Sequence, residues 1–268
     1  MLPENIRRLG EHDVVLAGYP GSGNAWLGCL FVKLGLFYLD GYHERLHDDV
    51  SQRTTILPIA RRDRLLTYRD RDKLHATYRE PVRIVKTHLH SNGFGDDPRF
   101  KTVVLARDGR DAVISYYNWL KSFGGLGDTL GEYLMHGTAE EQVPPSAAWA
   151  AFNEGWLDLL PRNRTYLIRF EDMRKDPVLE LDGLLKFLGA PRSREELLDA
   201  IGECSFATMR NRESEAVENN PDGLGQGMIM RRGEIGEWRS VFSPEEAAFV
   251  ESQCRDMLLR LGYPIAAK

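Results

Sequence analysis

The feature that most constrains the fold is a short apolar run that ends in a glycine-rich turn and leads directly into a helix-like segment. Residues 13–18 read as a buried strand, residues 21–23 (Gly-Ser-Gly) as the turn, and residues 24–34 carry apolar side chains at helical intervals. The pattern recurs at residues 101–106, which lead through a polar turn into a helical stretch at residues 111–121. Such alternation indicates a parallel sheet covered on both faces, with ligands at the carboxyl ends of the strands.

Other segments extend this α/β pattern. Two more runs, at residues 82–85 and 165–170, are predicted strands. We therefore expect a single domain over residues 1–268, with a central parallel β-sheet flanked by helices. Four further helices are predicted at residues 146–160, 177–188, 194–203 and 244–261. Three stretches are predicted surface loops that cover a ligand or gate an acceptor, at residues 124–127, 137–145 and 219–237.

The charge of the chain limits its partners. The 268 residues include 35 Lys and Arg against 40 Asp and Glu, a formal net charge of −5. A protein that binds nucleic acid broadly needs a basic face, so we expect no nucleic-acid partner, and any bound anion must be held by a local cluster of donors. The sequence has no apolar run of about 18 residues and no signal-peptide layout, which predicts a cytoplasmic protein without a membrane span.

The three cysteines and one pair of histidines are the residues that could form a disulfide or bind a metal. Cys29, Cys204 and Cys254 are odd in number, far apart and outside any C-x-x-C pair, so we expect reduced thiols in the core. His43 and His47 have the spacing to share a helix face. The glutamate of an H-E-x-x-H motif and a third ligand are missing, however, and we expect no metal.

The turn at residues 21–23 is a candidate anion site. Where a strand turns into a helix, unpaired backbone N–H groups and the positive end of the helix dipole point to the same place, and a phosphate binds there. An ordinary glycine turn has the same sequence, so the motif alone leaves both interpretations open. Gly23 is followed by Asn24 and Ala25, without the G-K-[ST] of a Walker motif, which argues against a nucleoside-triphosphate kinase.

Arg107 and Ser115 form a second candidate anion site. The arginine ends a predicted strand and the serine lies two turns into the next helix, so both side chains can reach one phosphate. The alternative is a surface arginine that pairs with Asp108 or Asp111.

A third strand delivers Lys86 and His88 to its end. Histidine titrates near neutral pH and can take a proton from an attacking hydroxyl. A single histidine is more often structural than catalytic, and His90 is an equally available candidate.

The order of these elements resembles that of the cytosolic-type sulfotransferases that depend on 3′-phosphoadenosine-5′-phosphosulfate (PAPS). Residues 19–26 (Y-P-G-S-G-N-A-W) resemble the family's Y-P-K-S-G-T-T-W loop, residues 86–89 its K-T-H-L segment, and residues 231–238 (R-R-G-E-I-G-E-W) its R-K-G-x-x-G-D-W segment. Residues 107–117 resemble its R-x-x-x-D-x-x-x-S-Y-Y segment. Residues 170–177 and 205–210 are similar to two further family segments. The family's fold is P-loop-NTPase-like, and six segments in family order extend from about residue 14 to residue 242.

The resemblance implies a chemistry and a set of site residues. PAPS would be the co-substrate, 3′,5′-ADP the product and a small molecule the acceptor, with no metal. His88 would be the general base, and Arg107, Arg231 and Arg232 would offset the charge of the nucleotide. Trp26 and Phe206 would flank the adenine. The residues assigned to the nucleotide are Gly21, Ser22, Gly23, Asn24, Ala25, Trp26, Arg107, Ser115, Phe170, Phe206, Arg231, Arg232 and Gly233.

Two departures from the family pattern bear on catalysis. The family lysine, which stabilises charge on the bridging oxygen, is replaced by Gly21, and the last threonine of the loop by Ala25. Losing one such electrostatic contact costs on the order of 10²–10³ in rate. Three interpretations follow: Lys86, or Ser22 with Arg232, takes over the role; the enzyme is slow; or the chain binds the nucleotide without turnover.

The acceptor is the least constrained part of the sequence. The aromatic stretches at residues 37–47 and 119–125 suit a phenolic or apolar small molecule, although aromatic residues near helix ends are more often core. We find no copy of the family's short C-terminal dimerisation segment.

Overall fold

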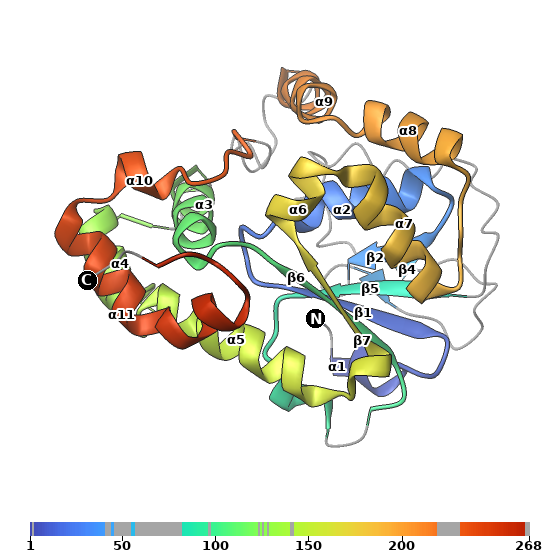
Figure 1. The fold of residues 1–268 in the computed structure, drawn as a ribbon, viewed down its shortest axis with the longest axis horizontal. Coiled ribbons are helices and arrows are strands. Elements are labelled where there is room, and N and C mark those ends of the chain that lie inside the picture. The colour runs from blue at the N-terminus through green and yellow to red at the C-terminus, as the bar shows by residue number, and fades with distance from the viewer. Residues whose placement is uncertain are drawn as a thin grey trace.

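The fold is an α/β arrangement in which a parallel sheet separates two groups of helices (Figure 1). In the computed structural model, the described residues are 1, 3–40, 44–45, 55–56, 82–95, 98–122, 124, 126–127, 129–139, 142–218 and 231–265.

The central sheet has five strands in the order β2-β5-β1-β6-β7, and every pairing is parallel. Its strands are β1 (Asp13–Gly18), β2 (Phe37–Asp40), β5 (Arg83–Thr87), β6 (Lys101–Ala106) and β7 (Thr165–Arg169). Ala17 pairs with Thr87 on one side and with Val104 on the other, so β1, β5 and β6 end at nearly the same level. The segments that follow these three strands are therefore neighbours, which is where parallel sheets bind ligands.

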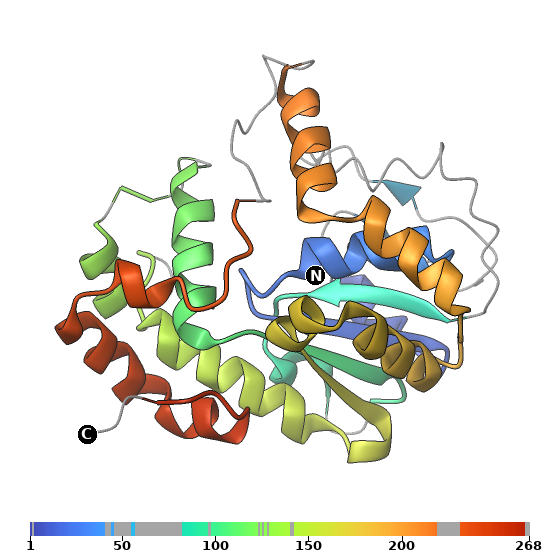
Figure 2. The same cartoon turned by 45° about the horizontal axis from the view of Figure 1, so that its top comes forward.

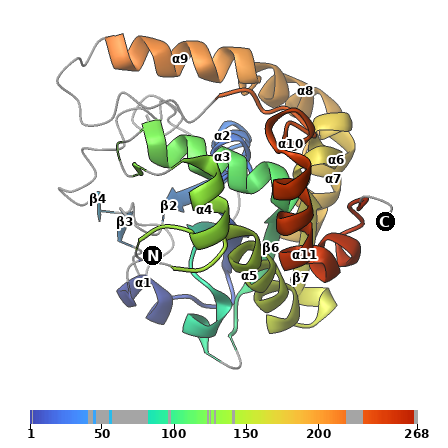
Figure 3. The same cartoon turned by 90° about the vertical axis from the view of Figure 1, so that its left-hand side faces the viewer.

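Alternate residues of the central strands enter two separate cores. Val15 and Val85 pack with α3 (Gly109–Ser122), α5 (Pro145–Leu159) and α11 (Pro244–Arg260). Leu16 and Ile84 pack with α2 (Asn24–Lys33), α7 (Pro177–Leu188) and α8 (Arg194–Glu203). This alternation follows from the period of two along a strand, and it buries the sheet on both faces. Figure 3 shows α5 and α11 side by side.

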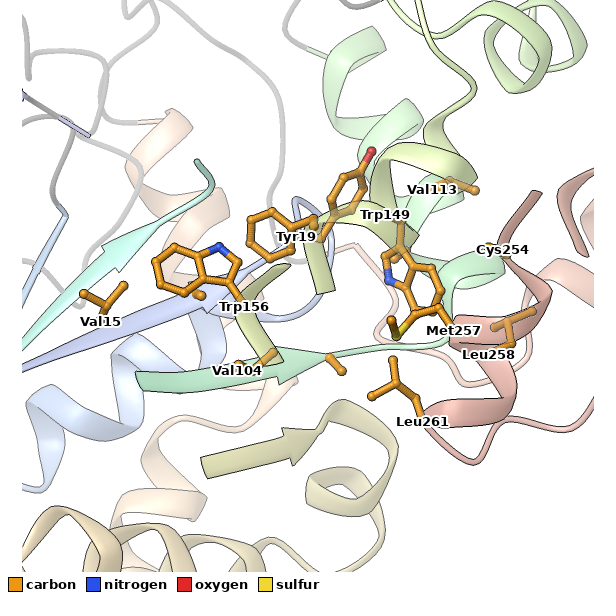
Figure 4. Packing of buried hydrophobic residues seen from close by; sticks show 14 of the residues in the cluster. Val15, Tyr19, Val104, Val113, Trp149, Trp156, Cys254, Met257, Leu258 and Leu261 are labelled. Atoms are coloured by element: carbon orange, nitrogen blue, oxygen red, sulfur yellow. The ribbon is translucent and has the colours of Figure 1, made fainter. Parts of the chain in front are cut away.

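The first of these cores is rich in tryptophan. Trp149 and Trp156 of α5 are fully buried, and they lie between β6 and the C-terminal helix α11. Figure 4 shows the Trp156 indole on the side of Val104 and the Trp149 indole on the side of Met257 and Leu258. This packing joins the C-terminal helix to the sheet and so positions the segment that precedes it.

The remaining elements are the 13-residue helix α9 and several short ones. They are α1 (Pro3–Arg7), the two-stranded pair β3 (Glu44–Arg45) and β4 (Thr55–Ile56), η3 (Ser91–Phe94), α4 (Leu130–His136), η4 (Arg162–Arg164), α6 (Phe170–Lys175), α9 (Phe206–Glu218) and α10 (Trp238–Val241).

The structure confirms the predicted strands and helices of the α/β pattern. It differs at residue 170, which was predicted to end a strand and instead begins α6, and the strand β2 and the helices α4 and α9 were not predicted. Residues 219–230 of the predicted cover loop lie outside the described residues, as do His43 and His47. No helix in the described part of the chain is long and apolar enough to span a membrane.

The prediction of three reduced cysteines is wrong for two of them. Cys29 of α2 and Cys204, which ends α8, form a disulfide, and both are fully buried. Their sequence separation of 175 residues gave no sign of the pairing, because only the packing of α8 against α2 brings them together. Cys254 is a buried free thiol, as expected, and burial raises its pKa to about 12.

Candidate active site

The site begins at the turn after the central strand β1. Gly21 and Gly23 have positive φ angles of 84° and 103°, a conformation that L side chains rarely adopt. A Cβ atom on Gly21 would lie 2.5 Å from the carbonyl oxygen of Ala112 in α3, and one on Gly23 would lie 2.7 Å from the ring of Phe170 in α6. Both glycines are therefore required by this backbone, and the turn fits closely between α3 and α6.

The N-terminus of α2 adjoins this turn. The N–H of Leu27 donates to the carbonyl of Gly23 at 3.2 Å, so the N–H groups before it have no partner within the helix. The Ser22 hydroxyl is buried and has no hydrogen-bond partner among the described residues. Buried polar groups nearly always have a partner. An orphan hydroxyl beside a helix N-terminus therefore fits an anionic ligand such as a phosphate.

Arg107, which follows β6, connects three segments of the site. Its Nη1 donates to the carbonyl of Gly21 at 2.9 Å, its Nη2 donates to the carbonyl of Glu234 at 2.8 Å, and its guanidinium lies 4.6 Å from the centre of the Phe170 ring. Burial lowers its pKa, and the nearby charge of Arg231 acts in the same direction. An arginine stays cationic in proteins, so this is a buried positive charge. Its Nε has no partner among the described residues.

The surface alternative for Arg107 is wrong, because only 4% of the residue is exposed. Asp108 pairs with Arg110 instead, at 2.7 Å between Oδ2 and Nη2. Asp111 also has another role, since its buried carboxylate accepts the N–H groups of Gly236 at 2.6 Å and Trp238 at 3.0 Å. Asp111 thus fastens residues 231–238 along α3, as Figure 2 shows for the segment that precedes α10. Burial raises the pKa of Asp111, and the two N–H bonds oppose that shift.

Arg231 and Arg232 share one carboxylate. Nη1 of Arg231 donates to Oε1 of Glu237 at 2.7 Å and its Nη2 donates to Oε2, while Nη1 of Arg232 lies 3.7 Å from Oε1. The side chain of Glu237 is 3% exposed and that of Arg231 is 32% exposed. The expected arginine cluster therefore contains a buried acid, Glu237, whose role the sequence does not indicate.

Ser115 lies on the surface of α3 that faces the turn after β1. Its Cβ is 3.0 Å from the position that a Cβ on Gly21 would take.

An aromatic cluster borders the turn. The ring centroids of Trp26 and Phe206 are 5.3 Å apart, and those of Trp26 and Phe170 are 5.9 Å apart. Arg174 lies 4.7 Å from the centre of the Phe206 ring, and a Cβ on Gly233 would lie 2.3 Å from the same ring. A flat ring between two aromatic faces needs roughly 7 Å, twice a contact distance. Trp26 and Phe206 are in direct contact, so adenine can enter between them only after the rings separate.

His88 follows β5 beside the end of β1. Its Nδ1 lies 2.6 Å from the carbonyl oxygen of Gly18. A carbonyl only accepts, so in the neutral imidazole Nδ1 carries the hydrogen and Nε2 is the basic nitrogen. The side-chain nitrogen of Asn24 lies 3.4 Å from the same carbonyl and links the helix that follows the turn to this position. Lys86 is on β5, two residues earlier, in register with Leu16 of β1.

An aromatic cluster extends from His90 along α5 and α3. The Tyr19 ring centroid lies 5.9 Å from that of Phe152 and 6.1 Å from that of Tyr116, which stacks on Trp119 at 5.9 Å. His90, the alternative base, packs edge-on against Phe152 at 5.7 Å. Trp119, the first residue of the expected acceptor stretch, therefore connects to His90 through this cluster. In the other expected stretch, Phe37, Tyr38 and Leu39 belong to the core.

Supporting contacts around Arg107 were not predicted. Glu171 of α6 accepts the N–H of Asp108 at 2.9 Å and the hydroxyl of Tyr263 at 2.8 Å, and burial raises the pKa of Glu171. Arg110 is buried between the carboxylates of Asp108 and Glu251. These bonds fix the residue that follows Arg107, but Glu171, Glu251 and Tyr263 are distant in sequence and no spacing identifies them. Within the described ranges, no three His, Cys, Asp or Glu residues are placed to hold a metal ion.

Comparison with known proteins identifies the family of the chain. The family model described as "Sulfotransferase domain" matches residues 11–262, so the chain belongs to the sulfotransferase family. This result confirms the resemblance drawn from the six segments. It also makes the chain an enzyme of the transferase class by family.

Curated relatives and solved structures match over most of their length. Flavonol 3-sulfotransferase from Flaveria bidentis is 26% identical over 91% of this chain and 81% of its own. Sulfotransferase 1E1 from Mus musculus is 28% identical over 86% of this chain and 78% of its own. The fold is similar to that of mouse sulfotransferase SULT7A1 complexed with PAP, with a TM-score of 0.66 and 19% identity over 96% of this chain and 88% of that one. The structure of retinol dehydratase in a complex with retinol and PAP gives a TM-score of 0.63 and 22% identity, over 97% of this chain and 84% of that one.

Proposed function

We propose that residues 1–268 form one catalytic domain that transfers the sulfuryl group of PAPS to a hydroxyl or amine of a small-molecule acceptor. The observation that carries the proposal is the position of Arg107. This buried cation joins the turn after β1 to residues 231–238, and it is close enough to Arg231 for the two charges to interact. Two arginines and a helix N-terminus meeting at one place favour a ligand with more than one phosphate-like group.

The described contacts support a division of the nucleotide site into three parts. The 5′-phosphosulfate is assigned to the backbone of residues 21–25, where the orphan hydroxyl of Ser22 supplies a further donor. The 3′-phosphate is assigned to Arg107, Ser115, Arg231 and the backbone of Gly233. The adenine is assigned to the cluster of Trp26, Phe170 and Phe206, where stacking on a base contributes about 1–3 kcal/mol per aromatic contact.

His88 is assigned as the general base. With Nδ1 donating to the Gly18 carbonyl, Nε2 is the basic nitrogen of the ring and takes the proton of the acceptor hydroxyl. As that proton moves to Nε2, the acceptor oxygen forms a bond to sulfur and the bond between sulfur and the 5′-phosphate oxygen breaks. The imidazolium then formed keeps its bond to Gly18, which holds the ring in one orientation throughout.

The charge on the leaving oxygen needs a donor, because position 21 has no side chain. Lys86, Ser22 and Arg232 are the assigned candidates. Lys86 lies on the strand next to β1, and its ammonium is a mobile point charge on a long stem, which suits a contact that forms only during transfer. Arg232 is 58% exposed and 3.7 Å from Glu237, so it can turn toward a ligand at little cost.

The proposal is tested by incubating the protein with radiolabelled PAPS and a panel of phenols, aliphatic alcohols, amines and sugars. We expect label transfer to at least one acceptor class. We also expect 3′,5′-ADP to raise the melting temperature more than ATP with Mg²⁺ does. Stabilisation by ATP with Mg²⁺ alone would overturn the assignment of the nucleotide.

The role of His88 is tested by His88→Ala. Transfer should fall below detection while the affinity for 3′,5′-ADP, measured by isothermal titration, stays within about threefold. A variant that loses nucleotide affinity instead would reject the role of base.

A second function is motivated by Gly21 and Ala25, because these residues lack the lysine and threonine side chains of the family's loop. A protein that binds PAPS or 3′,5′-ADP with little or no turnover has the same nucleotide site. Tight 3′,5′-ADP binding with no label transfer to any member of the acceptor panel would favour it.

A further inference from the structure

The buried carboxylate of Glu237 is unexplained by the site as proposed. Its side chain is 3% exposed and it lies among cations that the proposal assigns to the nucleotide. Burying a carboxylate is costly unless it is paired and hydrogen-bonded. Here it accepts from both terminal nitrogens of Arg231 and lies within ion-pair distance of Arg232. The cost of burial is therefore offset by one specific partner, which indicates a role connected with that arginine.

The backbone beside Glu237 is fixed independently of its side chain. Asp111 accepts the N–H groups of Gly236 and Trp238, the residues on either side. The two residues that flank Glu237 are therefore both bonded to α3, which fixes the backbone at Glu237 and lets its side chain support Arg231. A bidentate pair between carboxylate and guanidinium fixes the plane of the arginine as well as its position.

The geometry leaves donors of Arg231 available. A guanidinium has five N–H donors, and the pair with Glu237 engages one on each terminal nitrogen. The side chain of Arg231 is 32% exposed, whereas that of Glu237 is 3% exposed. The acid therefore holds a partly exposed guanidinium whose remaining N–H donors a ligand can use.

Glu237 also offsets a repulsion within the site. The charge of Arg231 lowers the pKa of Arg107, whereas the charge of Glu237 raises it. Two guanidinium groups that share one ligand repel each other when the ligand is absent. The carboxylate allows both to remain in place before the nucleotide arrives.

We propose that Glu237 is a positioning residue that holds Arg231 beside Arg107 in the ligand-free protein and thereby determines selectivity for a 3′-phosphate. The inference rests on the proposed function, since it deepens the assignment of the 3′-phosphate subsite. The structure supports a positioning role over competition with the ligand, because Glu237 is the more deeply buried partner of the pair.

The test compares two nucleotides that differ in the 3′-phosphate. The affinities of the full chain for 3′,5′-ADP and 5′-AMP are measured by isothermal titration for the wild type, Glu237→Gln, Glu237→Asp and Glu245→Gln. Glu245→Gln removes the same charge from an exposed position in the first turn of α11 and serves as the matched control. Thermal unfolding is recorded for each variant.

We expect Glu237→Gln to weaken 3′,5′-ADP binding about 10- to 100-fold and to leave 5′-AMP binding within threefold, because a neutral amide cannot hold the guanidinium bidentately. Glu237→Asp keeps the charge on a shorter side chain and should lose three- to tenfold in selectivity, less than Glu237→Gln, and Glu245→Gln should match the wild type. With an acceptor in hand, KM for PAPS should rise in Glu237→Gln while kcat stays nearly constant.

Several outcomes overturn the inference. They are an unchanged affinity ratio in Glu237→Gln, tighter 3′,5′-ADP binding that reveals a competing carboxylate, or an equal loss for both nucleotides. If Glu237→Gln does not fold, Glu237→Asp decides: a three- to tenfold loss of selectivity supports the inference and an unchanged ratio rejects it. A wild type that does not distinguish 3′,5′-ADP from 5′-AMP would instead reject the proposed function.

Discussion

Restoring the family lysine at position 21 should damage this protein. The backbone at Gly21 has φ +84°, which costs an L residue roughly 1–2 kcal/mol. A Cβ there would lie 2.5 Å from the backbone oxygen of Ala112, so the turn and α3 must move apart before any side chain fits. Overpacking of this kind costs about 1–3 kcal/mol. Together Gly21→Lys should lower the free energy of unfolding by about 2–5 kcal/mol.

The same movement affects binding and catalysis. Arg107 donates to the carbonyl of Gly21, so a displaced turn also displaces the group assigned to the 3′-phosphate. A misplacement of about 1 Å near a reacting centre can cost on the order of 10²-fold in rate. We therefore expect Gly21→Lys to bind 3′,5′-ADP at least tenfold more weakly and to transfer sulfuryl groups no faster than the wild type.

Urea denaturation, isothermal titration with 3′,5′-ADP and single-turnover transfer from labelled PAPS measure the three effects. Ala25→Thr is the matched control, since it restores the other family residue within the first turn of α2, where no positive φ is needed. That variant should unfold like the wild type and bind 3′,5′-ADP equally or more tightly. The reasoning is refuted if Gly21→Lys keeps wild-type stability and transfers faster.

Three further predictions follow from the contacts. Asp111→Asn places an amide N–H₂ opposite one of the two backbone N–H groups, and two donors cannot form a hydrogen bond with each other. We expect a loss of about 1–3 kcal/mol in the free energy of unfolding, measured by urea denaturation, and weaker 3′,5′-ADP binding, measured by titration. Phe206→Ala removes one wall of the aromatic cluster and should weaken 3′,5′-ADP by about 5- to 150-fold, the equivalent of 1–3 kcal/mol of stacking, with little change for inorganic pyrophosphate as a control ligand. Reducing the Cys29–Cys204 disulfide should lower the free energy of unfolding by about 2–4 kcal/mol. When the chain is unfolded without a reductant, iodoacetamide should label Cys254 alone. Labelling of all three cysteines would contradict the pairing.

The strands and long helices could be predicted because their apolar periodicity is local. The strand β2 was missed because its residues were assigned to the aromatic stretch at residues 37–47, and four residues are too few to show a period. The start of α6 was taken as strand because Phe170 continues the apolar pattern of β7.

The candidate site was predictable where its residues belong to recognisable segments and not where it depends on contacts between them. The resemblance placed Arg107 and Arg231 at one nucleotide, but the pairing of Arg231 with Glu237 and the anchoring by Asp111 have no sequence period. The sequence presented Gly21 as a missing lysine. The structure gives it a physical reason, because the backbone conformation and the nearby carbonyl of α3 exclude a side chain.

The covalent link between α2 and the end of α8 has a consequence at the bench. Cys29 lies one helical turn after Trp26, and Cys204 lies two residues before Phe206, so the bond ties together the supports of two of the three rings assigned to adenine. Protein purified with a strong thiol reductant and protein purified in air are then different molecules at the wall of this pocket. Nucleotide affinities from two preparations can be compared only when the free thiols in each have been counted.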